Sequence, residues 1–125
     1  MVWRVDAASA LADLVEISSQ VEAAVILDGE DAVTAATDDD GERLARTGSD
    51  LARIADARFG RAERRLAQLE VALGEGSVFV VRGDGRSIVA RTRPRPASAL
   101  VLHDLSTCLG AVTTKPRRKK VTVDA

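Results

Sequence analysis

The chain has 125 residues, of which 46% are hydrophobic and 30% are charged. This length suits one domain, since a single core commonly organises ~100–150 residues, and the apolar content is too high for a chain that is disordered throughout. The longest apolar stretches, Val21–Leu27 and Val78–Val81, are far shorter than the ~20 residues of a membrane-spanning helix. The sequence therefore excludes a fully disordered protein and a helical membrane protein.

Charge is distributed unevenly along a chain whose formal net charge is −1. Residues 1–42 carry 11 acidic side chains against one arginine, residues 113–125 carry five basic side chains against one acid, and the middle segment is near +5. Such a split suggests surfaces of opposite charge for partner or self recognition, although solvated faces and tails give the same pattern. Because the single cysteine rules out an internal disulfide and residues 1–6 do not resemble a secretory signal, we expect a cytoplasmic protein.

Hydrophobic spacing predicts a helix followed by a hairpin near the N-terminus. Asp6 is a good N-cap residue, and the helix is expected to run from about Ala7 to Ser19. Its apolar residues recur at near-helical spacing, at Leu11, Leu14, Val15 and Ile17. Val21–Asp28 is rich in alanine and β-branched residues and predicts a buried strand, and Asp28-Gly29 predicts a turn into a second strand at about Ala32–Thr37.

The second half predicts a long helix, three strands and a closing helix. The second helix is expected at about Glu42–Arg58, because Asp38–Asp40 offers N-cap residues and Gly60 ends the pattern. Alternating side chains and turn clusters then predict strands at Leu66–Leu73, Ser77–Arg82 and Arg86–Thr92, and renewed helical spacing predicts a helix at Ala97–Val112. From Thr113 the periodicity ends, and a basic block cannot bury a core, so residues 113–125 are expected to be a disordered tail.

This order of elements, αββαβββα, resembles the Roadblock/dynein light chain family. Leu14–Ser19 leading into Val21–Gly29 resembles the opening helix and hairpin of that family, and Pro96–Leu105 resembles its closing helix. The resemblance covers Ala7–Val112 and implies a Roadblock-like domain over residues 1–112. The implied fold is an α/β (α+β), profilin-like, three-layer one, whose five-stranded antiparallel sheet has the second helix on one face and the first and third on the other. Family members serve as dynein light chains, scaffold subunits or bacterial regulators of Ras-like small GTPases.

The resemblance also implies a homodimer, because family members typically pair through the second helix and the third strand. Gly48 is informative here: glycine costs ~1 kcal/mol relative to alanine inside a helix, yet Gly48 lies within the apolar stripe. We expect this small residue to let two second helices approach closely across the dimer axis. The alternative is that Gly48 faces the sheet of its own chain or marks a kink. The expected interface residues are Leu44, Gly48, Leu51, Ile54, Ala55, Leu69 and Val71.

No group of residues predicts an enzyme or a cofactor site. The single histidine, His103, has a neighbour, Asp104, that points about 100° away on a helix, and Cys108 lies on the apolar stripe of the last helix. The glycine clusters at 74–76 and 83–85 lack the ending of a phosphate loop and predict hairpin turns. The three consecutive acids of Asp38–Asp40 lack the alternate spacing of a calcium loop. We therefore expect no catalytic residue, no cofactor and no metal ion.

The expected function is that of a non-catalytic homodimeric adaptor, which binds a Ras-like small GTPase or a larger signalling or motor complex. Two alternatives stay open: a small-molecule-sensing module of a related three-layer α/β fold, and a purely structural scaffold subunit. The Ala- and Val-rich core argues against a ligand pocket. Specific nucleic-acid binding is not expected, since only two Phe and one Trp are available to stack on bases. The basic run Arg117–Lys120 is expected to give at most a weak electrostatic contact with a membrane.

Overall fold

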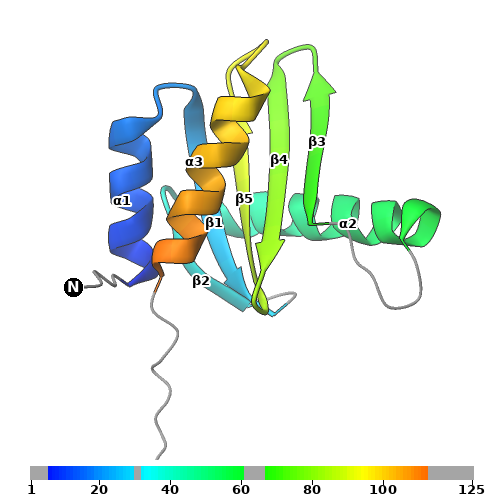
Figure 1. Cartoon of the computed structure of the whole chain (residues 1–125), viewed down its shortest axis with the longest axis horizontal. Coiled ribbons are helices and arrows are strands. Elements are labelled where there is room, and N and C mark those ends of the chain that lie inside the picture. Colours follow the sequence, from blue (N-terminus) through cyan, green and yellow to red (C-terminus); the bar gives the residue numbers. More distant parts are fainter. Residues whose placement is uncertain (1–5, 30–31, 61–66, 113–125) are drawn as a thin grey trace, which may run out of the picture.

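The computed structural model describes residues 6–29, 32–60 and 67–112. It contains three helices and five strands in the order predicted from the sequence, αββαβββα (Figure 1). The elements are α1 (Ala7–Ile17), β1 (Val21–Asp28), β2 (Ala32–Ala36), α2 (Gly41–Phe59), β3 (Gln68–Leu73), β4 (Gly76–Gly83), β5 (Arg86–Thr92) and α3 (Ser98–Ala111). Most bounds agree with the sequence prediction to within two residues. The predicted start of the third strand at Leu66 and the predicted tail 113–125 lie outside the described residues.

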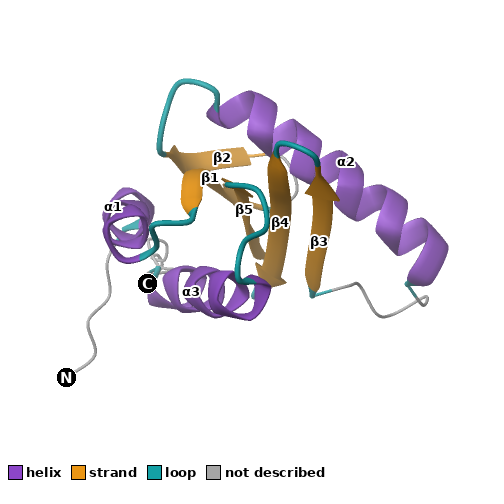
Figure 2. Cartoon of the chain, turned by 90° about the horizontal axis from the view of Figure 1, so that it is seen from above, coloured by secondary structure: helices purple, strands orange, loops and turns teal. Residues whose placement is uncertain are grey.

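The five strands form one antiparallel sheet in the order β2-β1-β5-β4-β3. Helices α1 and α3 cover one face and α2 crosses the other, so the molecule has three layers (Figure 2). This is the α/β fold class that the sequence and its family resemblance implied. The first and the last strand of this order, β2 and β3, are therefore the two edges of the sheet.

Alternation along the strands divides the buried apolar side chains between two cores. Ile26, Phe79 and Ile88 belong to the core beneath α1 and α3, whereas Val25 and Val89 belong to the core beneath α2. The central strands β1, β4 and β5 supply both cores, because helices cover both of their faces. This explains why their sequences are unbroken apolar runs, while β3, with only half-buried or exposed residues, alternates.

The helix starts agree only in part with the capping predicted from the sequence. The Asp6 carboxylate accepts a hydrogen bond from the Ser9 backbone amide at 2.8 Å, which confirms its N-cap role and lowers the pKa of Asp6. Asp40 occupies the N-cap position of α2, but its side chain makes no capping hydrogen bond. Instead, the Asp38 carboxylate accepts from the Asp40 amide at 3.0 Å. The N-cap residue of α2 thus comes from the predicted group Asp38–Asp40, but the expected side-chain capping bond is not formed, and Asp38 shapes the turn before the helix.

The glycine clusters form hairpin turns, as predicted. Asp84 and Gly85 both have positive φ angles, 54° and 77°, between the paired residues Gly83 and Arg86. A two-residue turn of this kind matches the twist of the flanking strands. The cluster at 74–76 likewise joins β3 to β4. In the described part of the chain, no helix is long and apolar enough to cross a membrane.

Candidate interaction surface

Helix α2 has a buried side made largely of small residues and an exposed side that carries most of its charges. Its buried residues are Gly41, Leu44, Ala45, Gly48, Ala52 and Ala55. Because these residues are small, the helix lies close to the sheet. Arg43, Arg46 and Arg53 lie on the solvent side, with Ile54, whose side chain is 61% exposed, among them.

The structure corrects the role that the sequence analysis gave to Gly48. A β-carbon at Gly48 would lie 2.7 Å from Cγ1 of Val89 and closer still to Cγ2, so this glycine faces β5 of its own chain. The alternative left open by the sequence is the one observed. Leu44 and Ala55 are also buried in the α2 layer of the same chain, at 7% exposure each. Because these three residues are covered within one chain, they are not available as contacts between two copies.

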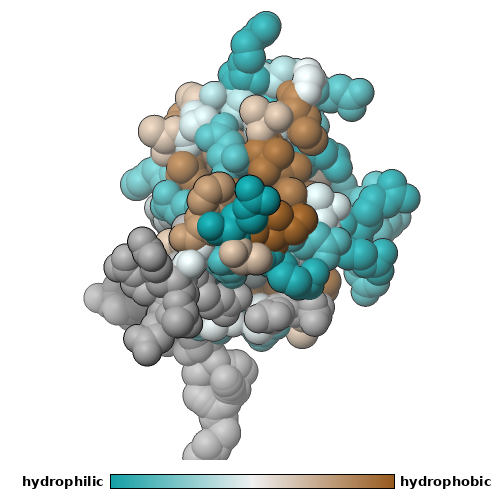
Figure 3. Space-filling model, turned by 90° about the vertical axis from the view of Figure 1, so that its right-hand side faces the viewer, coloured by the Kyte–Doolittle hydropathy of each residue, from teal (hydrophilic) through white to brown (hydrophobic). Residues whose placement is uncertain are grey.

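The other predicted interface residues are half-buried or exposed to solvent. Leu51 and Leu69 are half-buried and pack against the margin of the core beneath α2, and Val71 is also half-buried. Exposed apolar side chains extend this region at Ile54, Phe59 and Leu73, with exposures of 61%, 74% and 59%. We call these six residues the α2–β3 surface. Figure 3 faces the side of the molecule on which α2 ends and β3 lies, and it shows apolar residues gathered among hydrophilic ones.

Strand β3 gives this surface a second property, which is an open sheet edge. β3 pairs with β4 from Gln68 to Leu73, and no described strand lies on its other side. The backbone groups of an edge strand form a template for pairing with another strand. An exposed apolar surface beside such a template is suited to contact with another protein.

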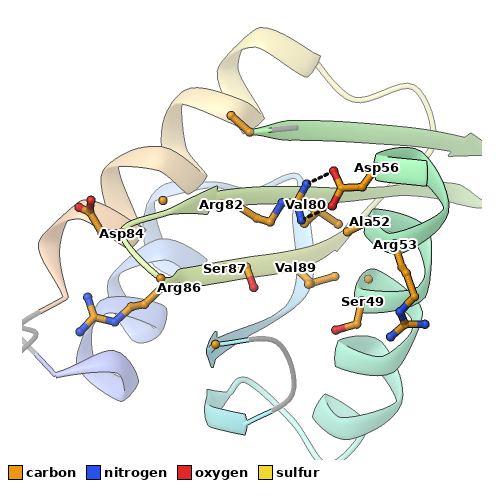
Figure 4. A pocket seen from close by; sticks show the side chains of 15 residues that line it. Ser49, Ala52, Arg53, Asp56, Val80, Arg82, Asp84, Arg86, Ser87 and Val89 are labelled. Atoms are coloured by element: carbon orange, nitrogen blue, oxygen red, sulfur yellow. Dashed lines mark hydrogen bonds and ion pairs between the residues drawn. The ribbon is translucent and has the colours of Figure 1, made fainter. Parts of the chain in front are cut away.

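A partly buried ion pair joins α2 to the sheet beside this surface. The Arg82 guanidinium of β4 donates two hydrogen bonds to the Asp56 carboxylate of α2, at 2.7 and 2.9 Å (Figure 4). The side chains are only 13% and 25% exposed. A two-point contact between a planar guanidinium and a carboxylate restrains orientation as well as distance. The pair therefore holds the C-terminal half of α2 at a fixed angle over β4.

Replacing Arg82 with methionine is expected to lower the free energy of unfolding by about 1–3 kcal/mol, because Asp56 would lose a charged hydrogen-bond partner in a partly buried place. The matched control is Arg53→Met. Arg53 pairs with Asp50 at 2.8 Å on the exposed side of α2, where the side chains are 65% and 54% exposed, and such pairs contribute about 0.5 kcal/mol or less. Urea unfolding of both variants measures the difference. Equal losses in the two variants would contradict the restraining role of Arg82.

A cleft of about 360 Å³ lies next to this ion pair. It is lined by small and apolar residues of α2, β4 and β5 together with polar ones such as Ser49, Arg53 and Ser87, and by the turn between β4 and β5 (Figure 4). An Ala- and Val-rich core argues against a ligand pocket. The cleft is nevertheless lined in part by such small and apolar residues, among them Ala52, Ala67 and Val80.

The residues considered for chemistry are placed as follows. His103 is exposed on α3. Cys108 is buried, its thiol lies 3.4 Å from the Ala10 carbonyl oxygen, and burial raises its pKa to about 11. A thiol that stays protonated at neutral pH is a poor nucleophile. Within residues 6–29, 32–60 and 67–112, no cluster of three or more His, Cys, Asp or Glu side chains is arranged to hold a metal ion.

Solved structures share this fold. A Roadblock/LC7 domain from Streptomyces avermitilis superposes with a TM-score of 0.72 at 21% identity, over 85% of this chain and 93% of that one. An MglB in a tetrameric arrangement gives a TM-score of 0.71 at 15% identity, over 85% and 84% of the two chains. LokiProfilin2, from its complex with rabbit actin, gives 0.57 at 13% identity, over 82% and 91%. No protein-family model matches the sequence, and no curated protein gives a significant match. The chain therefore has the Roadblock/LC7 fold that its sequence resembled.

Proposed function

We propose that this protein is a non-catalytic adaptor that forms a homodimer through the α2–β3 surface and, as a dimer, binds a Ras-like small GTPase. The observation that carries this proposal is the α2–β3 surface itself, where exposed apolar side chains border an open sheet edge. In a two-fold dimer, the same surface of each copy covers the other, and two β3 edges pair to join two sheets into one. The Roadblock resemblance implies pairing of the same two elements.

The proposed interface is smaller than the set of residues expected from the sequence. It uses Leu51, Ile54, Leu69 and Val71 from that set and adds Phe59 and Leu73. Leu44, Gly48 and Ala55 support the interface from within, since they seat α2 on its own sheet. A rigidly seated helix presents its exposed side chains in one arrangement, which lowers the entropy cost of association.

The GTPase is the proposed partner because the family resemblance includes regulators of Ras-like GTPases. Binding is expected to depend on the nucleotide, since the switch segments of such GTPases change order with the γ-phosphate. The protein would act by ordering the switch segments of the GTPase, and the GTPase itself would supply the catalytic groups.

A capture experiment tests this proposal. Immobilised full-length protein is incubated with native lysate supplied with either a non-hydrolysable GTP analogue or GDP, and retained proteins are identified by mass spectrometry. We expect one small GTPase to be enriched at least about tenfold in one nucleotide condition, a difference of about 1.4 kcal/mol in binding free energy. Retention of a large complex that is the same in both conditions would instead identify a structural scaffold subunit.

The small-molecule sensor is kept as a second candidate because of the cleft beside Arg82. Its lining combines small and apolar residues with polar and charged ones, an arrangement that would suit a polar ligand. Native mass spectrometry of the purified protein separates the two candidates, since a sensor carries a stoichiometric small molecule and the adaptor does not.

A further inference from the structure

The edge of the sheet opposite the α2–β3 surface lies in an acidic part of the protein. Residues 6–42 contain no lysine, arginine or histidine. Acidic side chains are exposed at both ends of β2: Asp28 lies before it, at the end of β1, and Asp38–Asp40 follows it. The negative charge at this edge is therefore balanced by no basic residue of the same segment.

Strand β2 itself is an open and uncharged edge. It is the terminal strand next to β1, and no described strand lies beyond it. Its five residues, Ala-Val-Thr-Ala-Ala, are exposed or half-buried. Sheet edges are usually protected by short strand length, β-bulges, charged residues or proline on the strand, or a covering segment. β2 is short and its pairing with β1 has one register shift, but it has neither lysine nor proline. Its backbone edge therefore stays available to a covering segment.

Helix α3 is followed by Val112, which lies close to the end of the sheet where β2 begins. The Val112 carbonyl oxygen accepts a hydrogen bond from Arg86 at 3.4 Å, and the same guanidinium contacts the Asp28 carboxylate at 3.1 Å. Asp28 is in register with Ala32, the first residue of β2. The chain thus passes Val112 close to the end of the sheet at which β2 begins.

The segment that follows has a matching length and the opposite charge. Residues 113–125 span up to roughly 43 Å when extended, whereas five strand residues span about 17 Å. All three lysines of the protein and two arginines lie within Lys115–Lys120, and Val121-Thr122-Val123 favours extended backbone. We infer that residues 113–125 of each chain dock along the outer edge of β2 of the same chain, with their basic side chains beside Asp28 and Asp38–Asp40.

This contact combines a strand-like cover with several weak ion pairs. Each exposed pair alone contributes little, but the pairs act on a tethered segment whose effective concentration at β2 is high. The contact is therefore expected to weaken with salt, because about 1 M salt shortens the Debye length to about 3 Å. It also gives the basic block Lys115–Lys120 a binding surface within the molecule.

Paramagnetic broadening tests the contact in the full-length chain. A nitroxide is attached at Thr122→Cys in a Cys108→Ser background, so that it is the only label site, and amide signals are compared with those of the reduced label. We expect signals of β2 and of residues 38–40 to lose at least about half of their intensity at low salt and to recover at about 1 M salt. The five-residue variant with glutamine at 115 and 117–120 is expected to show no such loss.

Two further experiments distinguish docking within one chain from contact between two chains and from binding of the tail to a membrane. Isotope-labelled protein without nitroxide, mixed with unlabelled protein that carries it, reports contacts between different chains. Broadening that is as strong in this mixture as within one chain would overturn docking in the same chain. Absence of broadening at β2, with tail signals that change only when phosphatidylserine vesicles are added, would overturn the inference in favour of a membrane ligand.

Discussion

Gly48→Leu is expected to be the most destabilising single substitution in α2, with the same loss at dilute and at concentrated protein. The position has no space for a side chain, because even a β-carbon would overlap with both Cγ atoms of Val89. Val89 is 1% exposed in the central strand β5 and is β-branched, so it cannot turn away. Overpacking of this kind costs about 1–3 kcal/mol, which exceeds the ~1 kcal/mol that helix propensity gains when glycine is replaced.

Thermal unfolding at two protein concentrations measures this effect. For a domain of this size, 1 kcal/mol corresponds to a change in Tm of roughly 4–8 °C. Thr47→Leu is the matched control, since Thr47 is the exposed neighbour in the same helix turn and its replacement is expected to change Tm little. If Gly48→Leu prevents folding, Gly48→Ala serves in its place.

Val89→Ala provides a second check on the Gly48 contact. Removal of both Cγ atoms makes room for a side chain at position 48, so Gly48→Ala is expected to cost less in the Val89→Ala background than alone, with a coupling of about 0.5–3 kcal/mol. Additive effects of the two substitutions would show that Gly48 does not pack against β5.

Gly48 also illustrates what the sequence can and cannot predict. Its place in the apolar stripe of α2 followed from spacing, and its burial is confirmed. Which surface covers the stripe did not follow, because periodicity identifies a buried face and not the neighbour that buries it. The structure supplies that neighbour, β5 of the same chain, and leaves Ile54 at the border of the stripe exposed.

The order and bounds of the elements were predictable because local signals mark them. Gly60 follows α2, the glycine pairs form the hairpin turns, and Pro94 follows β5. The site was less predictable, because its contacts join residues that are distant in the sequence. The Arg82–Asp56 pair spans 26 residues, and neither residue differs in its local pattern from other arginines and aspartates. The cleft beside it depends on how α2 crosses the sheet, which no local signal specifies.

Ile54→Asp is expected to convert the dimer into a folded monomer. Ile54 is 61% exposed in the isolated chain, so an aspartate at this position meets water and costs the monomer little. In the proposed dimer the same carboxylate would be buried without a partner, and a two-fold axis would bury it twice. A buried, unpaired charge costs about 3–5 kcal/mol, which corresponds to a rise in the dimer Kd of at least about 100-fold.

The control for Ile54→Asp is Ile17→Asp. Ile17 is 72% exposed at the end of α1, on the opposite face of the sheet from α2, so the same chemical change there is expected to leave the dimer intact. Sedimentation velocity over a range of micromolar concentrations, with circular dichroism to verify folding, compares both variants with the unchanged protein.

A dimer that tolerates Ile54→Asp but dissociates with Ile17→Asp would place the interface on the α1 side of the sheet and not at α2 and β3. An unchanged protein that is monomeric throughout this range would exclude the proposed homodimer. Both substitutions replace an exposed isoleucine with the same acid. A difference in dimer dissociation between the two variants therefore depends on where the residue lies, and the proposed α2–β3 interface requires the larger effect at Ile54.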